Sequence, residues 1–511
     1  MDIFAFSIYF VAMIAIGIYF FVKSKVVTEK DYFLGGRAMG PWVTAMSAQA
    51  SDMSAWLLMG LPGSILAYGF GQAWIGIGLA IGTAANWILV AKRLRKFSKA
   101  SNDAITLPQY LSNRFASKSH TVSIICAVVF LVCFTIYVAS AFVAGADVFT
   151  TLVPSLSRTA AMLIFAAIVV VYTFLGGFSA VCWTDFFQGL LMICALLIVP
   201  IVIVFAKDLD TAALATVYKG PNGEEFKFVA NFFNASWKDI ISGLGWGLGY
   251  FGMPHIIVRF MAIEKPSMVK KSATVAIIWV VLSLAATIVI AYLGRMFVYS
   301  DGRDLSAELL ANGKQSLIFV ELARDVFPAF IAGLLLAAII AASMSTADSQ
   351  LLVAASSFSS DLYKPLVRKN ATNKEMLWVS RAVVLAIAVV AYFIASSKGK
   401  AAQAIMDLVS NAWGIFGAAF GPAVLLSLFW KRFTYKGAVA GIVAGAVVDM
   451  AWLWAPVVNG ATLTSATGIY EIIPGFIIGG IIAIIVTLID KAPSKEVEAI
   501  FEKAIDNSID D

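Results

Sequence analysis

The stretch SAQASDMS, residues 47–54, places one carboxylate and three serines inside a long apolar segment. Two more stretches interrupt apolar segments in a similar way, GLGWGLGYFGMP at residues 243–254 and SMSTADS at residues 343–349. Hydrocarbon tolerates polar side chains and broken backbone only where they face a cavity, an ion or a substrate. These three stretches therefore predict a functional site at membrane depth, and they favour a transporter.

The composition around these stretches is that of a polytopic membrane protein. Of the 511 residues, 60% are hydrophobic and only 13% are charged, and the mean hydropathy is +0.88. A soluble domain is roughly half apolar and about a quarter charged. We expect an all-α fold of about 13 transmembrane helices of about 20 residues each, centred near residues 12, 54, 82, 135, 167, 193, 250, 285, 340, 387, 416, 447 and 479.

The positive charges predict the orientation in the membrane. With the N-terminus outside and the C-terminus in the cytoplasm, the inner segments are 23–40, 92–118, 262–272, 358–376, 430–436 and 491–511. They hold more than twice as many Lys and Arg as the outer segments near 151–158, 207–236, 299–325 and 397–402. Cytoplasmic loops carry the excess of Lys and Arg, so this orientation is favoured over its inverse. The first span starts with the acidic Asp2 and has no clear cleavage site, which favours an uncleaved helix.

An internal symmetry is visible in the order of the spans. Residues 41–206 and 237–429 each contain five spans, and each block opens with an interrupted helix. Because each block has an odd number of spans, the second block has the opposite orientation in the membrane to the first. Paired interruptions at corresponding positions of two such halves indicate a transporter binding site. We therefore divide the chain into a first helix and loop (1–40), two inverted repeats joined by an outer loop (207–236), two further helices (430–490) and an amphipathic cytoplasmic tail (491–511). The outer segment 303–325 is expected to form short amphipathic helices.

Three polar residues stand out within the apolar spans. Asp52 is the sole carboxylate of its span, so it is either part of a cation pathway or a hydrogen-bonded residue that orients nearby backbone. Ser345 and Thr346 are adjacent hydroxyls that could bind a hard cation such as sodium. Each alone could instead bond to its own helix.

The second interrupted helix carries an aromatic pattern. Trp246, Tyr250 and Pro254 are four residues apart, which predicts a shared helical face. Interleaved glycines and a proline favour an opened backbone beside an aromatic wall, although such stripes also serve packing. His255 could relay a proton, but a structural role is favoured.

The four cysteines fit apolar packing, and no ATP-binding, hydrolytic or redox motif is present, so an enzyme or ATP-driven pump is not expected.

Several stretches together resemble the solute:sodium symporter family, most closely its bacterial sodium/proline branch. The resemblance extends over nearly the whole chain and rests on residues 48–62 (AQASDMSAWLLMGLP), 176–185 (GGFSAVCWTD), 245–255 (GWGLGYFGMPH), 344–346 (MST) and 470–476 (YEIIPGF). It implies a leucine-transporter-like fold of five-plus-five inverted repeats with one helix before and two after the core. It also implies sodium-coupled uptake of L-proline by alternating access, in a bacterial plasma membrane.

The resemblance also implies the site residues. The sodium site would use the carbonyls of Ala50, Met53 and Ala342 and the hydroxyls of Ser345 and Thr346. The substrate pocket would be formed by Ser54, Ala55, Trp56, Tyr137, Trp246, Tyr250 and Pro254. Asp52 and Asp185 match family carboxylates linked to sodium use or to the route of the ion. Two positions depart from the pattern, namely Ala55, where glycine is expected, and Asp348, where a small neutral residue is more usual and which could add a cation contact.

Other functions stay open on the residues alone. A symporter of the same fold could carry another amino acid, a sugar or a monocarboxylate, although the few charges near the pocket argue against a multiply charged solute. A passive uniporter or channel is a further alternative, and downhill flux without sodium would identify it. The expected partners are the solute, sodium and the lipid bilayer, with no nucleic acid, and the oligomeric state is not specified by the sequence.

Overall fold

The apolar spans fold into helices, because only a helix satisfies the backbone of a single segment within hydrocarbon. The computed structural model describes residues 1–23, 28–175, 177–206, 208–219, 225–310, 313–397, 401–458 and 460–506, and these are mostly helical. Gly176 of the quoted motif, residues 207 and 220–224 of the outer loop and residues 507–511 of the tail lie outside the described residues. The structure agrees with the predicted all-α class in being mostly helical, with two short strand pairs besides.

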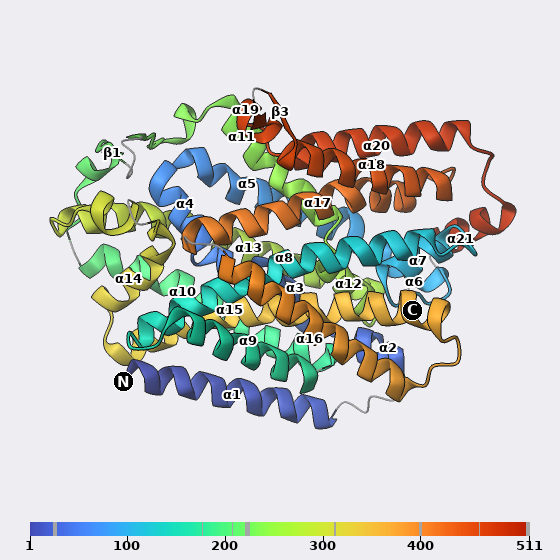
Figure 1. Ribbon diagram of the computed structural model, residues 1–511, viewed down its shortest axis with the longest axis horizontal. Coiled ribbons are helices and arrows are strands. Elements are labelled where there is room, and N and C mark those ends of the chain that lie inside the picture. Colours follow the sequence, from blue (N-terminus) through green and yellow to red (C-terminus); the bar gives the residue numbers. More distant parts are fainter. Residues whose placement is uncertain are drawn as a thin grey trace.

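The long helices run side by side along the longest axis of the molecule (Figure 1). They are α1 (Asp2–Lys23), α5 (Phe70–Ala85), α8 (Thr121–Leu152), α9 (Arg158–Leu175), α10 (Phe178–Ala206), α13 (Val269–Ser300), α15 (Ala329–Ser356), α16 (Asn373–Ser397), α17 (Ala401–Phe429), α18 (Tyr435–Trp454) and α20 (Ile472–Ile489). α5 continues through η3 (Asn86–Ala91) into α6 (Lys92–Ala100).

Two of the apolar spans are broken near their middle. The first consists of α3 (Pro41–Met53), η2 (Ala55–Leu57) and α4 (Gly60–Tyr68), and the second of α11 (Trp237–Gly245), η6 (Trp246–Phe251) and α12 (Pro254–Ala262). Both predicted interruptions are confirmed. In the part of the chain that the structure describes, ten helices are long and apolar enough to cross a membrane. The predicted spans near residues 54, 167 and 250 fall on α9 and the two broken helices, which are not among these ten, so the number 13 stays a prediction.

The remaining elements are short and lie mostly near the ends of the long helices. They are α2 (Glu29–Leu34), η1 (Gly35–Arg37), α7 (Leu107–Arg114), η4 (Thr211–Leu214), η5 (Phe232–Asn234), η7 (Pro266–Met268), η8 (Ser306–Leu310), η9 (Gln315–Leu317), α14 (Ile318–Val326), η10 (Ser357–Val367), α19 (Leu463–Thr467) and α21 (Lys495–Ile505). Two antiparallel strand pairs join β1 (Tyr218–Lys219) to β2 (Glu225–Phe226) and β3 (Pro456–Val458) to β4 (Ala461–Thr462). Short helices therefore form in the segment 303–325 and in the tail, as expected.

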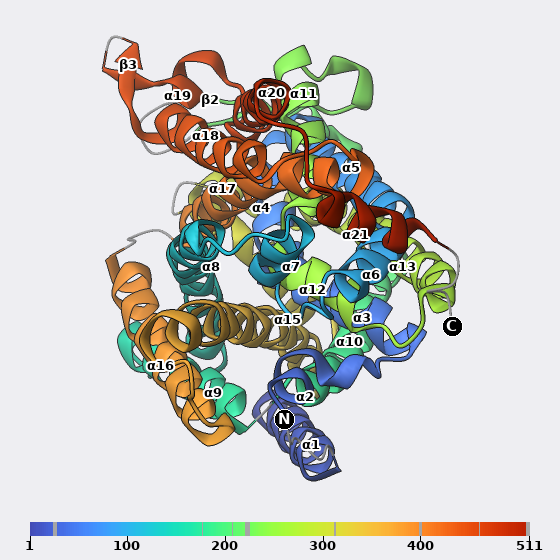
Figure 2. The same ribbon diagram turned by 90° about the vertical axis from the view of Figure 1, so that its right-hand side faces the viewer.

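The two ends of the molecule separate the predicted inner and outer segments. α2, α6, α7 and α21 gather at one end of the molecule, whereas β1, α14 and the N-terminus lie at the opposite end (Figure 1). Seen along the helices, α3, α12 and α15 are central, with α1 on one side and α18 and α20 on the other (Figure 2). Two of these central helices, α3 and α15, carry polar stretches, and α12 begins at the last residue of the remaining stretch, 243–254.

A cluster of charges stabilises the end that contains α2 and α6. Asp103 pairs with Lys30 at 2.5 Å, with Arg37 at 3.0 Å and with Lys99 at 3.4 Å. Burial alone would raise the pKa of Asp103, but the hydrogen bond from Lys30 and the nearby cations hold it below its ordinary value of 3.8. Arg37 also donates to the Ala104 carbonyl at 2.7 Å, so the cluster ties α2 to the segment after α6.

Candidate functional site

The first helix break leaves carbonyl groups without helical partners. α3 ends at Met53, and Ser54 has a φ of +47°, a conformation that is rare for a residue with a Cβ. The Ser54 hydroxyl accepts a hydrogen bond from the Trp56 N–H at 3.0 Å, which stabilises the turn. The last four carbonyls of an α-helix lack intrahelical partners, so those of residues 50–53 are free to bind other groups.

Two hydroxyls of α15 face the end of α3. The Ser345 hydroxyl lies 2.8 Å from the Ala50 carbonyl and 3.2 Å from the Ala342 carbonyl, and the Thr346 hydroxyl lies 3.5 Å from the Ala50 carbonyl. All four residues are buried. Oxygen ligands of this kind suit a hard cation. Met53 lies at the same helix end, but no hydrogen bond among the described residues links it to this group.

The second break brings an aromatic wall close to α17. A Cβ on Gly249 would lie 2.0 Å from Trp413 Nε1, so only glycine allows this approach. Trp413 Nε1 donates to the Trp246 carbonyl at 2.8 Å, and this bond holds the unwound segment. The expectation that Trp246, Tyr250 and Pro254 share one helical face does not hold. η6 is a 3₁₀-helix with about 3.0 residues per turn, and Pro254 begins a new helix.

Asp52 joins the two breaks. The Tyr250 hydroxyl donates to Asp52 Oδ2 at 2.6 Å, and the Tyr137 hydroxyl of α8 donates to the Asp52 carbonyl at 3.5 Å. The Asp52 side chain is buried. Its carboxylate therefore binds a phenol of the opposite broken helix, which fits the orienting role, and the cation-pathway role stays a prediction.

An aromatic pocket lies beside this junction. Its lining consists of Asp52, Met53, Trp56, Leu79, Tyr137, Trp246, Tyr250, Val409 and Trp413. The rings of Trp56 and Trp246 are stacked, with centroids 5.4 Å apart and planes inclined by 27°. The pocket has a volume of about 10 Å³, which is room for one water molecule. It must therefore widen before an organic solute can enter.

The lining agrees only in part with the predicted pocket residues. Four of them line it, namely Trp56, Tyr137, Trp246 and Tyr250. Ser54, Ala55 and Pro254 do not line it and lie instead at the two breaks. Leu79, Val409 and Trp413 line the pocket without having been predicted. They come from helices α5 and α17, which are not broken near these residues, so no interruption of a helix marks them in the sequence.

A buried ion pair lies one turn further along α15. Arg259 of α12 donates to Asp185 of α10 at 3.0 Å and to the Ser47 hydroxyl of α3 at 3.0 Å. It also donates to the Ser349 hydroxyl at 2.5 Å, and Ser349 in turn donates to Asp348 at 3.3 Å. Arg259 thus contacts Asp185 directly and Asp348 through Ser349, two of the three carboxylates that the sequence marked, and it was not itself predicted. The signal for it was a lone arginine within the apolar stretch 254–263.

Comparison with known proteins identifies the family. The sequence profile of the Sodium:solute symporter family matches residues 32–445. The sodium/proline symporter of Escherichia coli (strain K12) is 42% identical over 507 residues, which cover 98% of this chain and 95% of that protein. The chain belongs to the sodium:solute symporter family. An osmoregulated proline transporter of Bacillus subtilis is 40% identical over 489 residues, 96% of this chain and 95% of that protein.

The fold of this symporter also matches a solved structure. It is similar to a Na⁺-coupled sialic acid symporter in a substrate-bound, outward-open state, with a TM-score of 0.76 and 20% identity. The match covers 97% of this chain and 99% of the other. At this level of identity the likeness shows the fold alone, which is the leucine-transporter-like fold that the sequence predicts.

His255 is the remaining titratable group that the sequence singled out. Its ring packs edge-on against Phe134, with centroids 5.6 Å apart, and against Tyr137, at 6.3 Å. Its backbone carbonyl accepts a hydrogen bond from Arg259. These contacts fit a structural role for His255 at the start of α12.

Proposed function

We propose that this symporter couples the inward movement of sodium to the uptake of L-proline by alternating access. The observation that carries the proposal is the 41–42% identity, over 98% of the chain, to several curated sodium/proline symporters. The pocket chemistry supports it, because stacked indole and phenol rings suit a small solute with an apolar ring. Asp52 is the only charged group in the pocket lining.

We further propose that the chain crosses the membrane thirteen times. The ten long helices and the three shorter apolar spans, α9 and the two broken helices, would form one helix, two inverted five-helix repeats and two final helices. The N-terminus would lie outside and the C-terminus in the cytoplasm. The strongly basic helix α6 (KRLRKFSKA) and the weakly basic α7 lie at one end of the molecule, and they support this orientation (Figure 1).

Sodium is proposed to bind where α3 meets α15. The carbonyls of Ala50, Met53 and Ala342 and the hydroxyls of Ser345 and Thr346 would surround the ion. In the structure the Ser345 hydroxyl proton points to a carbonyl, so it must rotate to offer a lone pair to the cation. The positive charge would then hold together oxygens that otherwise repel each other, and it would fix the end of α3.

The substrate is proposed to bind on the other side of the same helix end. Helix N-termini and unwound segments present free N–H groups that attract anions, so the backbone N–H groups near Ser54 and Ala55, at the start of η2, would bind the substrate carboxylate. Trp56 and Trp246 would separate and enclose the proline ring, with Tyr137, Tyr250 and Pro254 completing the pocket. Rocking of the broken helices against the others would then open the site inward.

The ion is proposed to leave along α15. Asp348 and Ser349 lie three and four residues beyond Ser345, so they continue the same helical face towards the proposed cytoplasmic side. Asp185 lies beside them through Arg259. A departing sodium would have to displace Arg259 from a carboxylate, and the freed negative charge would then hold the ion on its way out.

The available driving force is sufficient. Moving one charge through 100 mV yields about 2.3 kcal/mol, and a tenfold sodium gradient yields about 1.4 kcal/mol. Together they sustain a roughly 500-fold gradient of a zwitterion at one-to-one coupling.

Uptake of labelled proline into proteoliposomes that contain only this protein tests the proposal. An inward sodium gradient should drive accumulation above the outside concentration, whereas an equal potassium gradient should not. Sodium-independent, downhill flux would instead identify a passive uniporter. An absence of proline uptake by folded, inserted protein would overturn proline as the substrate, and competition by other amino acids, sugars and monocarboxylates would then find the solute.

A further inference from the structure

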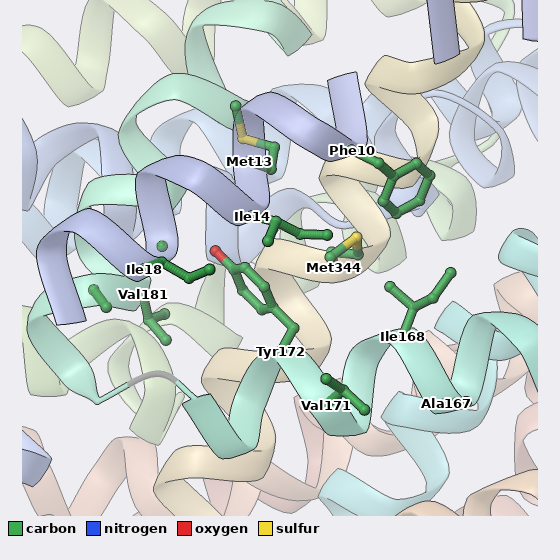
Figure 3. Close-up of a pocket in the computed structure, with 12 residues that line it drawn as sticks. Phe10, Met13, Ile14, Ile18, Ala167, Ile168, Val171, Tyr172, Val181 and Met344 are labelled. Carbon is green, nitrogen blue, oxygen red and sulfur yellow. The ribbon is translucent and has the colours of Figure 1, made fainter. Parts of the chain in front are cut away.

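A second and larger pocket lies away from the candidate site, between α1, α9, α10 and α15 (Figure 3). Its volume is about 290 Å³. It is lined by Phe10, Met13, Ile14, Gly17, Ile18, Ala167, Ile168, Val171, Tyr172, Ala180, Val181 and Met344. Apart from the phenol of Tyr172, these side chains are hydrocarbon or thioether, so the pocket suits an apolar ligand.

The pocket is continuous with the surface that faces the lipid. Ile14 is 46% exposed, Ile18 is 47% exposed and Val171 is 57% exposed. The first two lie in a helix long and apolar enough to cross a membrane, and Val171 lies in the shorter apolar helix α9. At this depth the surroundings are hydrocarbon rather than water. The walls of an empty pocket lose dispersion contacts, so the neighbouring acyl chains are the natural occupants.

The one polar group of the pocket indicates which part of a lipid binds there. The Tyr172 side chain is 9% exposed, and its hydroxyl lies close to the Thr184 side chain without reaching the geometry of a hydrogen bond to any described residue. The nearby Thr184 directs its own hydroxyl to the carbonyls of Ala180 and Val181. Figure 3 shows the Tyr172 oxygen pointing towards α1, beside Ile14 and Ile18. A buried hydroxyl without a partner is costly, so a ligand with a hydrogen-bond acceptor is favoured.

The depth of Tyr172 matches the acceptor of a phospholipid. Tyr172 lies one turn before the end of α9 at Leu175, near the boundary where the ester carbonyls of lipids lie. From Ile18 to Phe10 the pocket follows α1 for eight residues, which corresponds to about 12 Å towards the bilayer centre. The two ends of the pocket therefore differ in polarity in the same way as the two ends of an acyl chain.

We propose that this pocket binds one acyl chain of a membrane phospholipid, with its ester carbonyl accepting a hydrogen bond from Tyr172 and its methyl end near Phe10. In the orientation proposed above, the lipid belongs to the cytoplasmic leaflet. Met344 forms part of the wall and is adjacent to Ser345 in the sequence. The bound chain thus packs against the back of the helix that carries the proposed sodium ligands.

Photolabelling of the full-length protein in proteoliposomes tests the proposal. One phospholipid carries a diazirine near the ester, and a second carries it near the chain end. After illumination, mass spectrometry locates the adducts. The first probe should label Tyr172 and Ile18, and the second should label Phe10 and Met13. Both should label the pocket more densely than Leu385, which is 49% exposed on α16 and lies outside the pocket.

Matched variants make the test specific. Ala167→Phe places a ring at the mouth of the pocket, and it should lower labelling of the pocket about tenfold, as expected for the loss of two buried methylenes. Ala15→Phe introduces the same ring at an exposed alanine of α1 outside the lining, and it should leave labelling unchanged. Labelling equal to that of Leu385, an equal effect of both variants, or crosslinks through Ile14 between two copies of the chain would overturn the proposal.

Discussion

Replacing Ser345 by alanine tests the proposed sodium site most directly. The hydroxyl lies 2.8 Å from the Ala50 carbonyl and 3.2 Å from the Ala342 carbonyl, so the variant removes one oxygen from the centre of the group. A hydrogen bond or ligand to a charged group contributes about 1.5–3 kcal/mol. At 1.4 kcal/mol for each factor of ten, the sodium concentration for half-maximal uptake should rise about 10- to 150-fold.

The same helix offers a matched control. Ser343 is equally buried, but its hydroxyl donates only to the Ile339 carbonyl of its own helix, at 2.9 Å. Initial rates of proline uptake into proteoliposomes, measured against sodium concentration, should change by no more than about twofold for Ser343→Ala, since back-bonding within a helix adds little. Ser345→Thr keeps the hydroxyl and should restore most of the affinity. Equal sodium dependence of Ser345→Ala and Ser343→Ala would refute the assignment of Ser345 as a ligand.

Three further predictions follow from individual contacts. Trp413→Phe removes the donor to the Trp246 carbonyl, which should cost about 1–3 kcal/mol and raise the KM for proline at least about fivefold at saturating sodium; an unchanged KM contradicts a role in shaping the pocket. Arg259→Gln leaves Asp185 buried without its cation and should reduce the free energy of unfolding by about 3–5 kcal/mol. The thermal unfolding midpoint in detergent measures this loss, and adding Asp185→Asn should recover part of it. Because the cluster at Asp103 lowers its pKa, its stabilisation is present above the ordinary value of 3.8 and is lost as pH falls through the folded pKa. Wild-type protein should therefore lose stability below about pH 4 more steeply than Asp103→Asn.

The architecture could be predicted because the membrane imposes simple rules on the sequence. Apolar length reveals the long helices, and serines, glycines and a proline within apolar spans reveal the two breaks. The number of crossings was less secure. α3 has only 13 residues and α11 only nine, because each helix ends where the backbone unwinds. Length alone therefore does not show whether such pieces form one crossing.

The partnerships within the site could not be predicted from the residues. Trp413 and Trp246 are 167 residues apart, and Arg259 and Asp185 are 74 apart. Which side chains meet depends on which helices lie side by side, and a lone tryptophan or arginine carries no information about that. The spacing argument for Trp246, Tyr250 and Pro254 failed for a related reason, since it assumed 3.6 residues per turn where the glycines allow a tighter helix.

The end of α3 explains how the two proposed binding events can depend on each other. The Ala50 carbonyl belongs to the proposed sodium site, and Asp52, two residues later, bonds to Tyr250 in the wall of the pocket. Ser54 has a positive φ, a backbone conformation that few residues with a Cβ adopt. Such a turn persists only when the residues packed around it hold it in place. A cation bound at the proposed site would stabilise this turn and so reduce the free energy needed to order it when proline binds. By linkage, proline would then increase the affinity for sodium by the same factor. The strained turn between the two sites is thus the element through which one ligand would favour binding of the other.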